Sequence, residues 1–455
     1  MIGSGLGMGD SGVYGKLQQM FRKIYNVIQQ KSQAIEIDQV SFNVYGFSRG
    51  AATARMFVHR VLRYGHDKDI TKEVDKLLNE EERYINQQPF DHISDKENRK
   101  PPAKQLSFKD DLKTTRFKVK FVGLFDTVSS IGMNHDDDIK DEKQQLVFSD
   151  TCRPNQVVHI VAGHEFRQKF ATTTIASAVQ NGCGFEVVLP GCHTDIGDGL
   201  DTRWVKSKNT GEEVVKWENK HVDDSTTICH KYNLANLPFI PLAKAKLLAL
   251  GLFQVAQAEE KALLKLQRAD FGKVIDILSA QGWFDKDKKE IWRDDDTFKM
   301  DKIKVNRDFK NNSKSGIKSI SPDYPKIATK LMFDIMTDIG VNRNYNFSKY
   351  DIENFGGDKN LKDIAEKLIK KAMTHYKENK TKKHCFVGGN IINGSQKDIA
   401  CNVDVDEELR EMLYHDYLHW CSTMKRDPAS LLLAYVSVPH INPQTNQFYR
   451  TVYQG

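Results

Sequence analysis

The chain has 455 residues, of which 39% are hydrophobic and 28% are charged, a balance typical of a globular protein with one large or two ordinary domains. Its formal net charge of +6 is a small difference between 67 basic and 61 acidic side chains. Such a mild excess does not favour a nucleic-acid partner, although it is compatible with weak attraction to anionic surfaces such as lipid headgroups.

The cysteine pattern and the N-terminus indicate a cellular compartment. Seven cysteines form neither a C-x-x-C pair nor an even framework, which predicts a reducing compartment and mostly buried or free thiols. Residues 1–15 lack the basic and apolar stretches of a secretory signal, and no apolar window approaches the roughly 18 residues of a membrane-spanning helix. We therefore expect contact with a membrane only from outside, or after export by a route without a signal peptide.

A glycine-rich loop (GSGLGMGDSG, 3–12) precedes a segment, 13–31, whose apolar residues recur at the spacing of an amphipathic helix. A G-x-G-x-G run before a helix also occurs in dinucleotide and phosphate sites. Here no strand precedes the run, and no lysine follows at the spacing of a phosphate-binding loop. We expect a loop near an active site rather than a nucleotide site, and we expect no cofactor.

The most informative motif is a G-x-S-x-G sequence centred on Ser48. Residues 38–45 alternate as a strand does, and residues 51–64 carry apolar side chains at helical spacing. We expect glycines on both sides of the serine because this strand-to-helix turn is too sharp for side chains. The turn would lift the Ser48 hydroxyl to the sheet edge and place the Arg49 N–H in an oxyanion hole, which predicts a nucleophile elbow.

Further strands are predicted at 116–125, which ends at Asp126, and at 184–190, which is followed by a glycine-rich segment with His193. Between the first two strands, residues 65–115 are dominated by charge and predict a solvated helical insertion. Residues 155–171 begin with a short apolar run, and their pattern predicts that this run passes into a helix. The acidic stretch 134–142 lacks the spacing of a calcium loop and is more typical of a solvated loop.

From about residue 236 the pattern becomes helical and continues to about 425, before one more predicted strand at 430–439. We predict an α/β fold, with an α/β-hydrolase-like, mostly parallel sheet, helices on both faces and a large helical C-terminal region. The predicted domains are a catalytic core, 1–235, with its insertion at 65–115, and a mainly helical region, 236–455. The last segment, 430–455, could return to the core sheet.

Three candidate catalytic residues each follow a predicted strand: Ser48, Asp126 and His193. In open α/β sheets the chemistry lies beyond the carboxyl ends of the strands. A serine hydroxyl needs a base to take its proton and a carboxylate to orient that base. The order serine, acid, histidine is also that of α/β-hydrolases. The sequence therefore predicts a serine hydrolase without a metal.

Two members of this set have rivals. Asp126 could be only a turn former, and Asp195 or Asp198 could replace it as the carboxylate partner. His440 follows the predicted last strand, where many hydrolases carry their histidine, and it is the main rival to His193.

Other histidines favour structural roles. His415 and His419 have the i, i+4 spacing of a metal pair, but without the H-E-x-x-H glutamate we expect a packed helix face with Trp420. His164 and Glu165 are expected to be structural or to support the site from behind.

Three segments in order, GFSRGAA, GLFDTVSSIG and LPGCHTDIGDG, resemble the motifs of an α/β-hydrolase family of uncharacterised domains that includes the type VI secretion lipase effectors of the Tle1 class. The segment VVHIVAGHEFRQKF and the opening glycine-rich loop are also similar to that family. The resemblance spans about residues 1–200. It implies Ser48 as nucleophile, Asp126 as orienting acid and His193 as general base.

The resemblance further implies phospholipase A-type activity on glycerophospholipids, with a phospholipid membrane surface as substrate. Such effectors are made in the bacterial cytoplasm and delivered without a signal peptide into a rival's periplasm. They have a secretion spike protein and a cognate immunity protein as partners, and no nucleic acid. The alternatives are a hydrolase of another ester, and a non-catalytic secreted cargo or docking protein that retains the elbow.

The sequence departs from the family pattern at two places. Asp198 stands where a glycine is usual, which is expected to reshape the His193 loop. The family pattern also has a strand and a short turn ahead of the glycine-rich loop, with which this sequence begins. The resemblance therefore implies a truncated or split form that lacks one strand and one oxyanion-hole donor.

Overall fold

A computed structural model provides the structure of the chain. It describes residues 13–64, 117–129, 146–197, 323–341, 359–379, 407–419 and 448–455, apart from a few single positions, and also the backbone of short strands in 202–306, 386–387 and 440–441. Several predicted features lie outside the described residues: the loop 3–12, the insertion 65–115, the acidic stretch 134–142, Asp198, and the strand 430–439.

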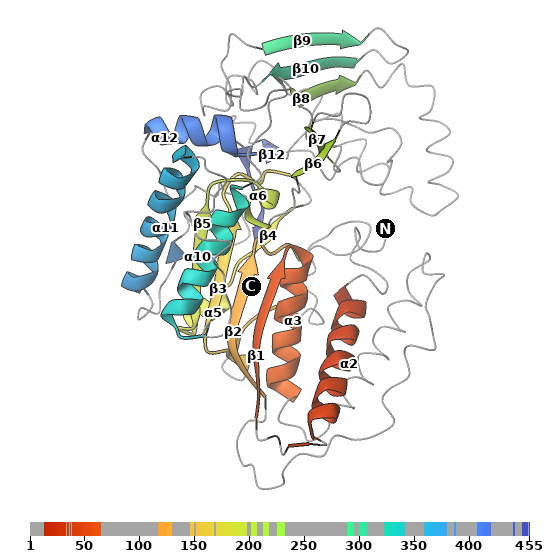
Figure 1. Ribbon diagram of the computed structural model, residues 1–455, viewed down its shortest axis with the longest axis vertical. Coiled ribbons are helices and arrows are strands. Elements are labelled where there is room, and N and C mark those ends of the chain that lie inside the picture. The colour runs from red at the N-terminus through yellow and green to blue at the C-terminus, as the bar shows by residue number, and fades with distance from the viewer. Residues whose placement is uncertain are drawn as a thin grey trace, which may run out of the picture.

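Five parallel strands form the central sheet in the order β1-β2-β3-β5-β11 (Figure 1). They are β1 (Val40–Phe47), β2 (Phe117–Phe125), β3 (Val157–Ala162), β5 (Gly184–Leu189) and β11 (Phe386–Val387). All four pairings are parallel, so the carboxyl ends of these strands lie at one edge. The three strands predicted up to residue 190 are confirmed within two residues of their expected bounds.

Helices cover both faces of this sheet, as predicted. On one face α3 (Arg49–Tyr64) packs against β1, with the rings of Phe42 and Phe57 5.5 Å apart. On the other face lies α10 (Pro325–Asp338), whose Met336 sulfur is 3.3 Å from the Tyr45 hydroxyl of β1. The alternation of side chains along a strand accounts for this division.

Two further helices complete the layers. The predicted N-terminal helix is α2 (Val13–Ser32), which packs on α3 through Phe21 and Phe57 at 5.2 Å. On the other side α11 (Lys359–Asn379) lies beside α10 and contacts β5, where Phe185 and Tyr376 are 5.2 Å apart. The sheet is thus covered by α2 and α3 from the N-terminal half on one face and by α10 and α11 from the C-terminal half on the other.

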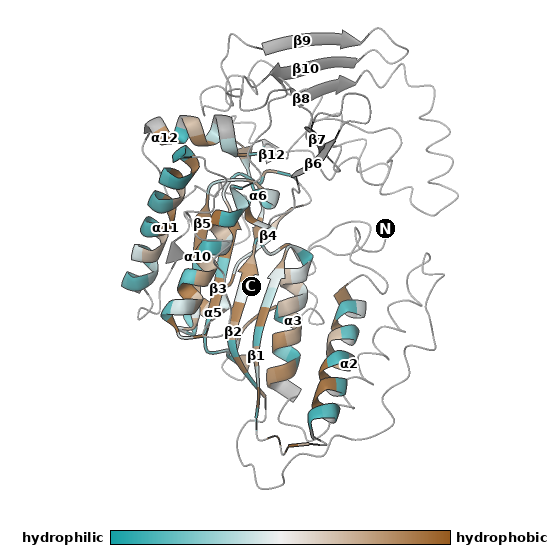
Figure 2. Cartoon of the chain, in the orientation of Figure 1, coloured by the Kyte–Doolittle hydropathy of each residue, from teal (hydrophilic) through white to brown (hydrophobic). Residues whose placement is uncertain are grey.

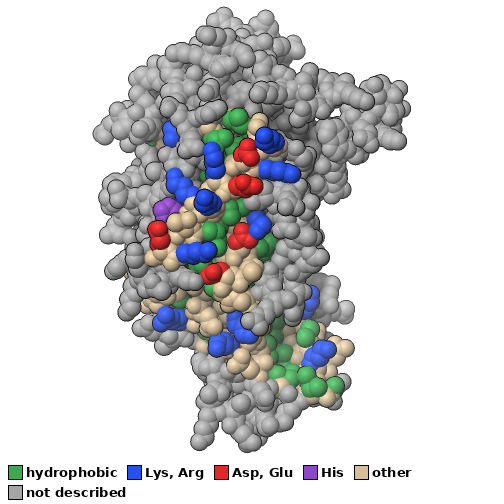
Figure 3. Space-filling model, turned by 60° about the vertical axis from the view of Figure 1, so that its left-hand side comes forward, with side chains coloured by type: hydrophobic (Ala, Val, Ile, Leu, Met, Phe, Trp, Pro, Cys, Tyr) green, Lys and Arg blue, Asp and Glu red, His purple; other side chains and the backbone are tan. Residues whose placement is uncertain are grey.

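The distribution of polarity explains this packing. Figure 2 shows hydrophobic central strands and helices that are hydrophilic on their outer sides. In the view of Figure 3, basic and acidic side chains are interleaved on the described surface. Two ion pairs lie at α10: Lys330–Asp334 within the helix, and Lys326–Asp323, whose aspartate precedes it. Among the described residues, no helix is long and apolar enough to cross a bilayer.

Two expectations about local structure were wrong. No helix follows β3: residues 163–166 form a turn and an extended segment, because His164 and Glu165 bind neighbouring loops. The helical pattern beyond 236 is also interrupted, because β9 (Lys289–Asp294) and β10 (Met300–Asn306) form an antiparallel sheet with β8 (Ser225–Tyr232). A hairpin of β6 (Thr202–Lys206) and β7 (Glu213–Trp217) precedes them.

The last residues of the chain pair with a strand of the N-terminal half. Strand β12 (His440–Ile441) pairs with β13 (Phe448–Tyr449), and β14 (Val452–Tyr453) pairs in parallel with β4 (Thr172–Thr173). The described part of the predicted returning segment thus joins a small two-stranded sheet rather than the central one. Two short helical elements, α12 (Glu407–Met412) and the π-helix η8 (Leu413–Tyr417), precede it. The division into domains at residue 235 stays a prediction.

The prediction that the cysteines are mostly buried or free thiols is confirmed only in part. Cys152 and Cys183 are buried and free, as expected. Cys192, next to His193, is instead disulfide-bonded.

Candidate active site

The elbow around Ser48 has an unusual backbone. Ser48 directly follows β1 and begins the turn into α3, with φ of 57°. Asp126 directly follows β2, with φ of 41°. They are the only non-glycine residues with positive φ among those that the structure describes. Positive φ costs a side-chain-bearing residue free energy and is found mainly where the surrounding structure enforces it, often at functional sites.

The two flanking glycines have different roles. A Cβ on Gly46 would lie 2.3 Å from the Gly50 carbonyl oxygen, so only glycine fits there. A Cβ on Gly50 would meet no atom within 4 Å. The expectation that both glycines serve the sharp turn is therefore correct for Gly46 and wrong for Gly50.

The elbow and the Asp126 turn are bonded to each other. Strands β1 and β2 pair in register with Phe47 opposite Phe125, so Ser48 and Asp126 leave the sheet side by side. The Ser48 N–H donates to the Phe125 carbonyl at 3.0 Å, and the Val128 N–H donates to the Ser48 carbonyl at 3.3 Å. These bonds hold the two strained residues in one fixed arrangement.

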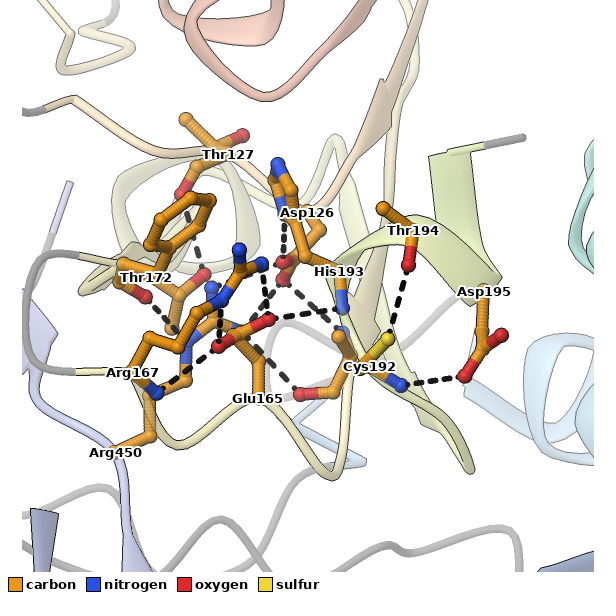
Figure 4. Close-up of polar contacts among 12 residues, drawn as sticks. Asp126, Thr127, Glu165, Arg167, Thr172, Cys192, His193, Thr194, Asp195 and Arg450 are labelled. Atoms are coloured by element: carbon orange, nitrogen blue, oxygen red, sulfur yellow. Dashed lines mark hydrogen bonds and ion pairs between the residues drawn. The ribbon is translucent and has the colours of Figure 1, made fainter. Parts of the chain in front are cut away.

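His193 begins the short helix α6 (His193–Gly197), beyond the end of β5. Its Nδ1 lies 2.6 Å from Oδ2 of Asp126 (Figure 4). Its ring packs against Phe47, the residue before Ser48, at 4.4 Å between centroids, and against Phe170 at 5.1 Å. The structure therefore brings the predicted acid and base together beside the predicted nucleophile.

The loop before His193 is shaped by its neighbours. Gly191 has φ of 115°, a conformation that favours glycine, and its N–H donates to Nδ1 of His164 at 2.8 Å. The His193 N–H donates to Glu165 at 3.2 Å, and Glu165 also accepts two bonds from the Arg167 side chain. His164 and Glu165 therefore position the histidine loop from behind, as the sequence predicted.

Arg450 from the C-terminal segment binds both carboxylate oxygens of Asp126. Nη1 donates to Oδ1 at 2.7 Å, and Nη2 donates to Oδ2 at 2.9 Å. Both side chains are buried. The Ala162 N–H donates to Oδ1 at 3.0 Å, and Arg450 Nε donates to the Phe170 carbonyl at 2.7 Å. The sequence did not predict Arg450, because a lone arginine in a short β-rich stretch carries no motif.

These contacts set the charges of the pair. Burial would raise the pKa of the Asp126 carboxyl, but Arg450 and the hydrogen bond from His193 outweigh it and hold this pKa well below its ordinary value. Burial lowers the pKa of His193, although Asp126 acts in the opposite direction. Near neutral pH the pair is a carboxylate and a neutral imidazole. Nδ1 then carries the proton, which leaves the Nε2 lone pair available.

Of the rival residues, Asp195 has other partners, and the role of His440 stays a prediction. Asp195 accepts bonds from the Cys192 N–H at 2.9 Å, the His419 N–H at 3.0 Å and His419 Nδ1 at 2.5 Å, and it is His419 rather than His193 that it orients. His440 lies on β12, paired with Tyr449, and its side chain lies outside the described residues.

The expected packed helix face at His415 and His419 was wrong. The helix ends at Tyr417, because Leu418 is extended with φ of −87° and ψ of 139°. His419 thus lies beyond the helix, bonded to Asp195. Within the described part of the chain, no group of three His, Cys, Asp or Glu side chains could hold a metal ion.

A second buried pair supports the Asp126 turn. Nε2 of His159 accepts the Thr127 N–H at 3.0 Å, so the proton is on Nδ1, which lies 2.7 Å from Glu186. Glu186 also accepts the Ile175 N–H at 3.0 Å. Because its buried polar groups are paired, this cluster fixes the backbone after Asp126.

Comparison with known proteins identifies a related family. Residues 7–217 match the model of a family described as T6SS, Phospholipase effector Tle1-like, catalytic domain. The resemblance to the Tle1-like family is confirmed for this part of the chain. The Tle1-like region includes Ser48, Asp126 and His193, whereas Arg450 lies outside it. None of the curated proteins compared with the chain matches it.

Two solved structures match the chain. One is the Tle1 effector bound to the VgrG spike from the type 6 secretion system, with a TM-score of 0.48 and 15% sequence identity. That match covers 99% of this chain and 76% of the other. The second, an uncharacterized protein from Pseudomonas aeruginosa, has a TM-score of 0.19 at 22% identity, over 40% of this chain and 22% of that chain.

Proposed function

We propose that the chain is a serine esterase that hydrolyses acyl esters of glycerophospholipids, a phospholipase of the A type. The observation that carries the proposal is the strained Ser48 at the end of β1, beside the buried Asp126–His193 pair at 2.6 Å. The Tle1-like family match over residues 7–217 supports a phospholipid as substrate rather than another ester.

In the proposed reaction, Nε2 of His193 takes the proton from the Ser48 hydroxyl as its oxygen attacks the ester carbonyl. The imidazolium that forms is stabilised by the Asp126 carboxylate. The Arg49 N–H lies at the start of α3, where backbone donors have no partner within the helix, and it would bind the oxyanion. His193 then gives its proton to the leaving lysolipid alcohol, and water releases the fatty acid by the same steps.

We further propose that the protein is an antibacterial type VI secretion effector. It would be made in the bacterial cytoplasm and exported without a signal peptide. It would then act in the periplasm of a target cell, on the membrane there. The family resemblance supports a secretion spike protein and an immunity protein as partners.

The test is labelling with a fluorophosphonate, which reacts with activated serines, alongside fatty-acid release from mixed phospholipid micelles. We expect wild-type protein to be labelled and to release fatty acid, and Ser48→Ala to do neither while remaining folded. Full turnover by Ser48→Ala would refute the mechanism. Labelling without fatty-acid release, and with hydrolysis of monomeric esters, would favour another ester substrate. A folded but unlabelled wild-type protein would favour a non-catalytic role.

A further inference from the structure

Arg450 lies where it can control the charge and the direction of the Asp126 carboxylate. Its guanidinium spans both carboxylate oxygens at 2.7 and 2.9 Å, although the two residues are 324 positions apart in the sequence. Bidentate pairs of this kind fix orientation as well as charge. We propose that Arg450 is a positioning residue, which holds Asp126 ionised and in line with His193, so that the C-terminal segment completes the site. This inference rests on the proposed function.

The bonding of the carboxylate gives the geometric reason. Oδ1 accepts from Arg450 Nη1 and the Ala162 N–H, and Oδ2 accepts from His193 Nδ1 and Arg450 Nη2. The two Arg450 bonds lock the rotation of the carboxylate, since one lies on each oxygen. Without them, only the Ala162 bond would oppose a rotation that takes Oδ2 away from His193.

The charge of the buried site gives the second reason. With Arg450 present, the carboxylate, the guanidinium and the neutral imidazole sum to zero, and the ion pair of Glu165 and Arg167, which also faces His193, adds no net charge. Without Arg450 the same buried site carries one negative charge. It then takes up a proton at higher pH, whether the Asp126 carboxylate or the His193 imidazole receives that proton. An opposite charge at this distance shifts titration by roughly 1–3 pH units. Arg450 therefore keeps His193 available as a base to lower pH.

The arginine is itself anchored. Its Nε donates to the Phe170 carbonyl at 2.7 Å, and Nη1 also lies 3.3 Å from the Ala162 carbonyl. The adjoining β14 pairs with β4, and the Thr172 N–H donates to the Thr451 carbonyl at 3.1 Å. The position of the guanidinium is therefore set by the backbone around it and does not depend on Asp126 alone.

The experiment compares Arg450→Gln, Arg450→Lys and a control, Arg55→Gln, in the full chain. Arg55 is also a fully buried arginine, but it donates to the carbonyls of Leu146 and Thr173 and is absent from the Asp126 contacts. Two quantities would be followed from pH 4 to 9: the rate of Ser48 labelling by a fluorophosphonate, and the titration of the His193 ring by NMR with ¹⁵N-labelled histidine. Circular dichroism would confirm folding.

We call the acidic pH range over which the labelling rate falls the acid limb. For Arg450→Gln we expect this acid limb and the His193 titration to move up by roughly 1–3 pH units. Arg450→Lys keeps the charge but cannot span both oxygens. Its limb should stay near that of wild type, while kcat falls about fivefold or more at unchanged KM. Arg55→Gln should lower thermal stability and leave the limb in place.

Several outcomes would overturn the proposal. One is that the labelling rate of Arg450→Gln falls at the same acidic pH as that of wild type. Another is that Arg450→Gln and Arg55→Gln show the same pH profile of labelling and the same His193 titration. If Arg450→Gln does not fold, wild-type kcat in Arg450→Lys would overturn it. Absence of Ser48 labelling in wild type would refute the proposed function instead, and the NMR titration would still test the role of Arg450.

Discussion

The candidate site joins two regions that differ in how the sequence encodes them. The groups assigned to the chemistry lie at the ends of β1, β2 and β5, inside the Tle1-like region. Three supporting contacts come from the last tenth of the chain: Tyr414 bonds His164, His419 bonds Asp195, and Arg450 bonds Asp126. The first region is marked by motifs and the second by none. A site can therefore be recognised from one region and yet depend on another for its geometry.

The largest expected effect is the difference in kcat between variants of the two carboxylates near His193, Asp126 and Asp195. Asp126→Asn should lower kcat on the order of 10³–10⁴-fold, because an amide cannot orient and stabilise the imidazolium as a carboxylate does. Asp195→Asn, which replaces one of the two accepting oxygens of Asp195 by an amide donor, should lower kcat by no more than about tenfold through loosening of α6. Steady-state kinetics on a monomeric ester would measure both. Equal losses would mean that Asp195 has a direct role.

The next comparison is between the two glycines of the elbow. Gly46→Ala forces a methyl group to within 2.3 Å of a backbone oxygen and should lower the free energy of unfolding by about 2–4 kcal/mol, with loss of Ser48 labelling. Gly50→Ala adds a methyl group in open space on a helix and should be neutral, or stabilising by up to about 1 kcal/mol. Denaturant titration measures both. A tolerated Gly46→Ala would show that the elbow can relax.

The third prediction concerns the pH dependence of the wild-type site. Because burial lowers the pKa of His193, its neutral, basic form should already predominate below the ordinary value of about 6.5. We expect kcat/KM to be constant around neutral pH and to fall about tenfold per unit only once the pH drops below the His193 pKa. A profile of fatty-acid release against pH measures this limb. A limb above pH 7 would contradict a neutral base.

The smallest effect tests a support far from the proton transfer. Tyr414→Phe removes the hydrogen bond of 2.8 Å that the Tyr414 hydroxyl accepts from Nε2 of His164, whose Nδ1 accepts the N–H of Gly191 in the loop before His193. One lost hydrogen bond should cost about 1 kcal/mol of stability and leave the acid limb in place. Thermal unfolding and the pH profile would show this. A moved limb would place Tyr414 among the groups that tune His193.

Much of the catalytic half could be predicted because its signals are local. The strand at 116–125 and the glycine-flanked serine follow from alternation and from turn chemistry, which act over a few residues. The prediction failed where tertiary contacts override local preference. Residues 163–171 look helical, but His164 and Glu165 are used to hold a neighbouring loop. Likewise, strands β9 and β10 depend on pairing with β8 rather than on their own pattern.

The sequence by itself determined the α/β class, the elbow at Ser48 and the candidate acid and base, because strand ends and tight turns are set by nearest neighbours. Only the tertiary structure decided that Asp126 rather than Asp195 contacts His193 and that His419 lies beyond its helix, bonded to Asp195. It also decided that Arg450 binds the Asp126 carboxylate. Those contacts join residues that are 67, 224 and 324 positions apart. Partners at such separations are chosen by how the layers pack, which no local pattern contains.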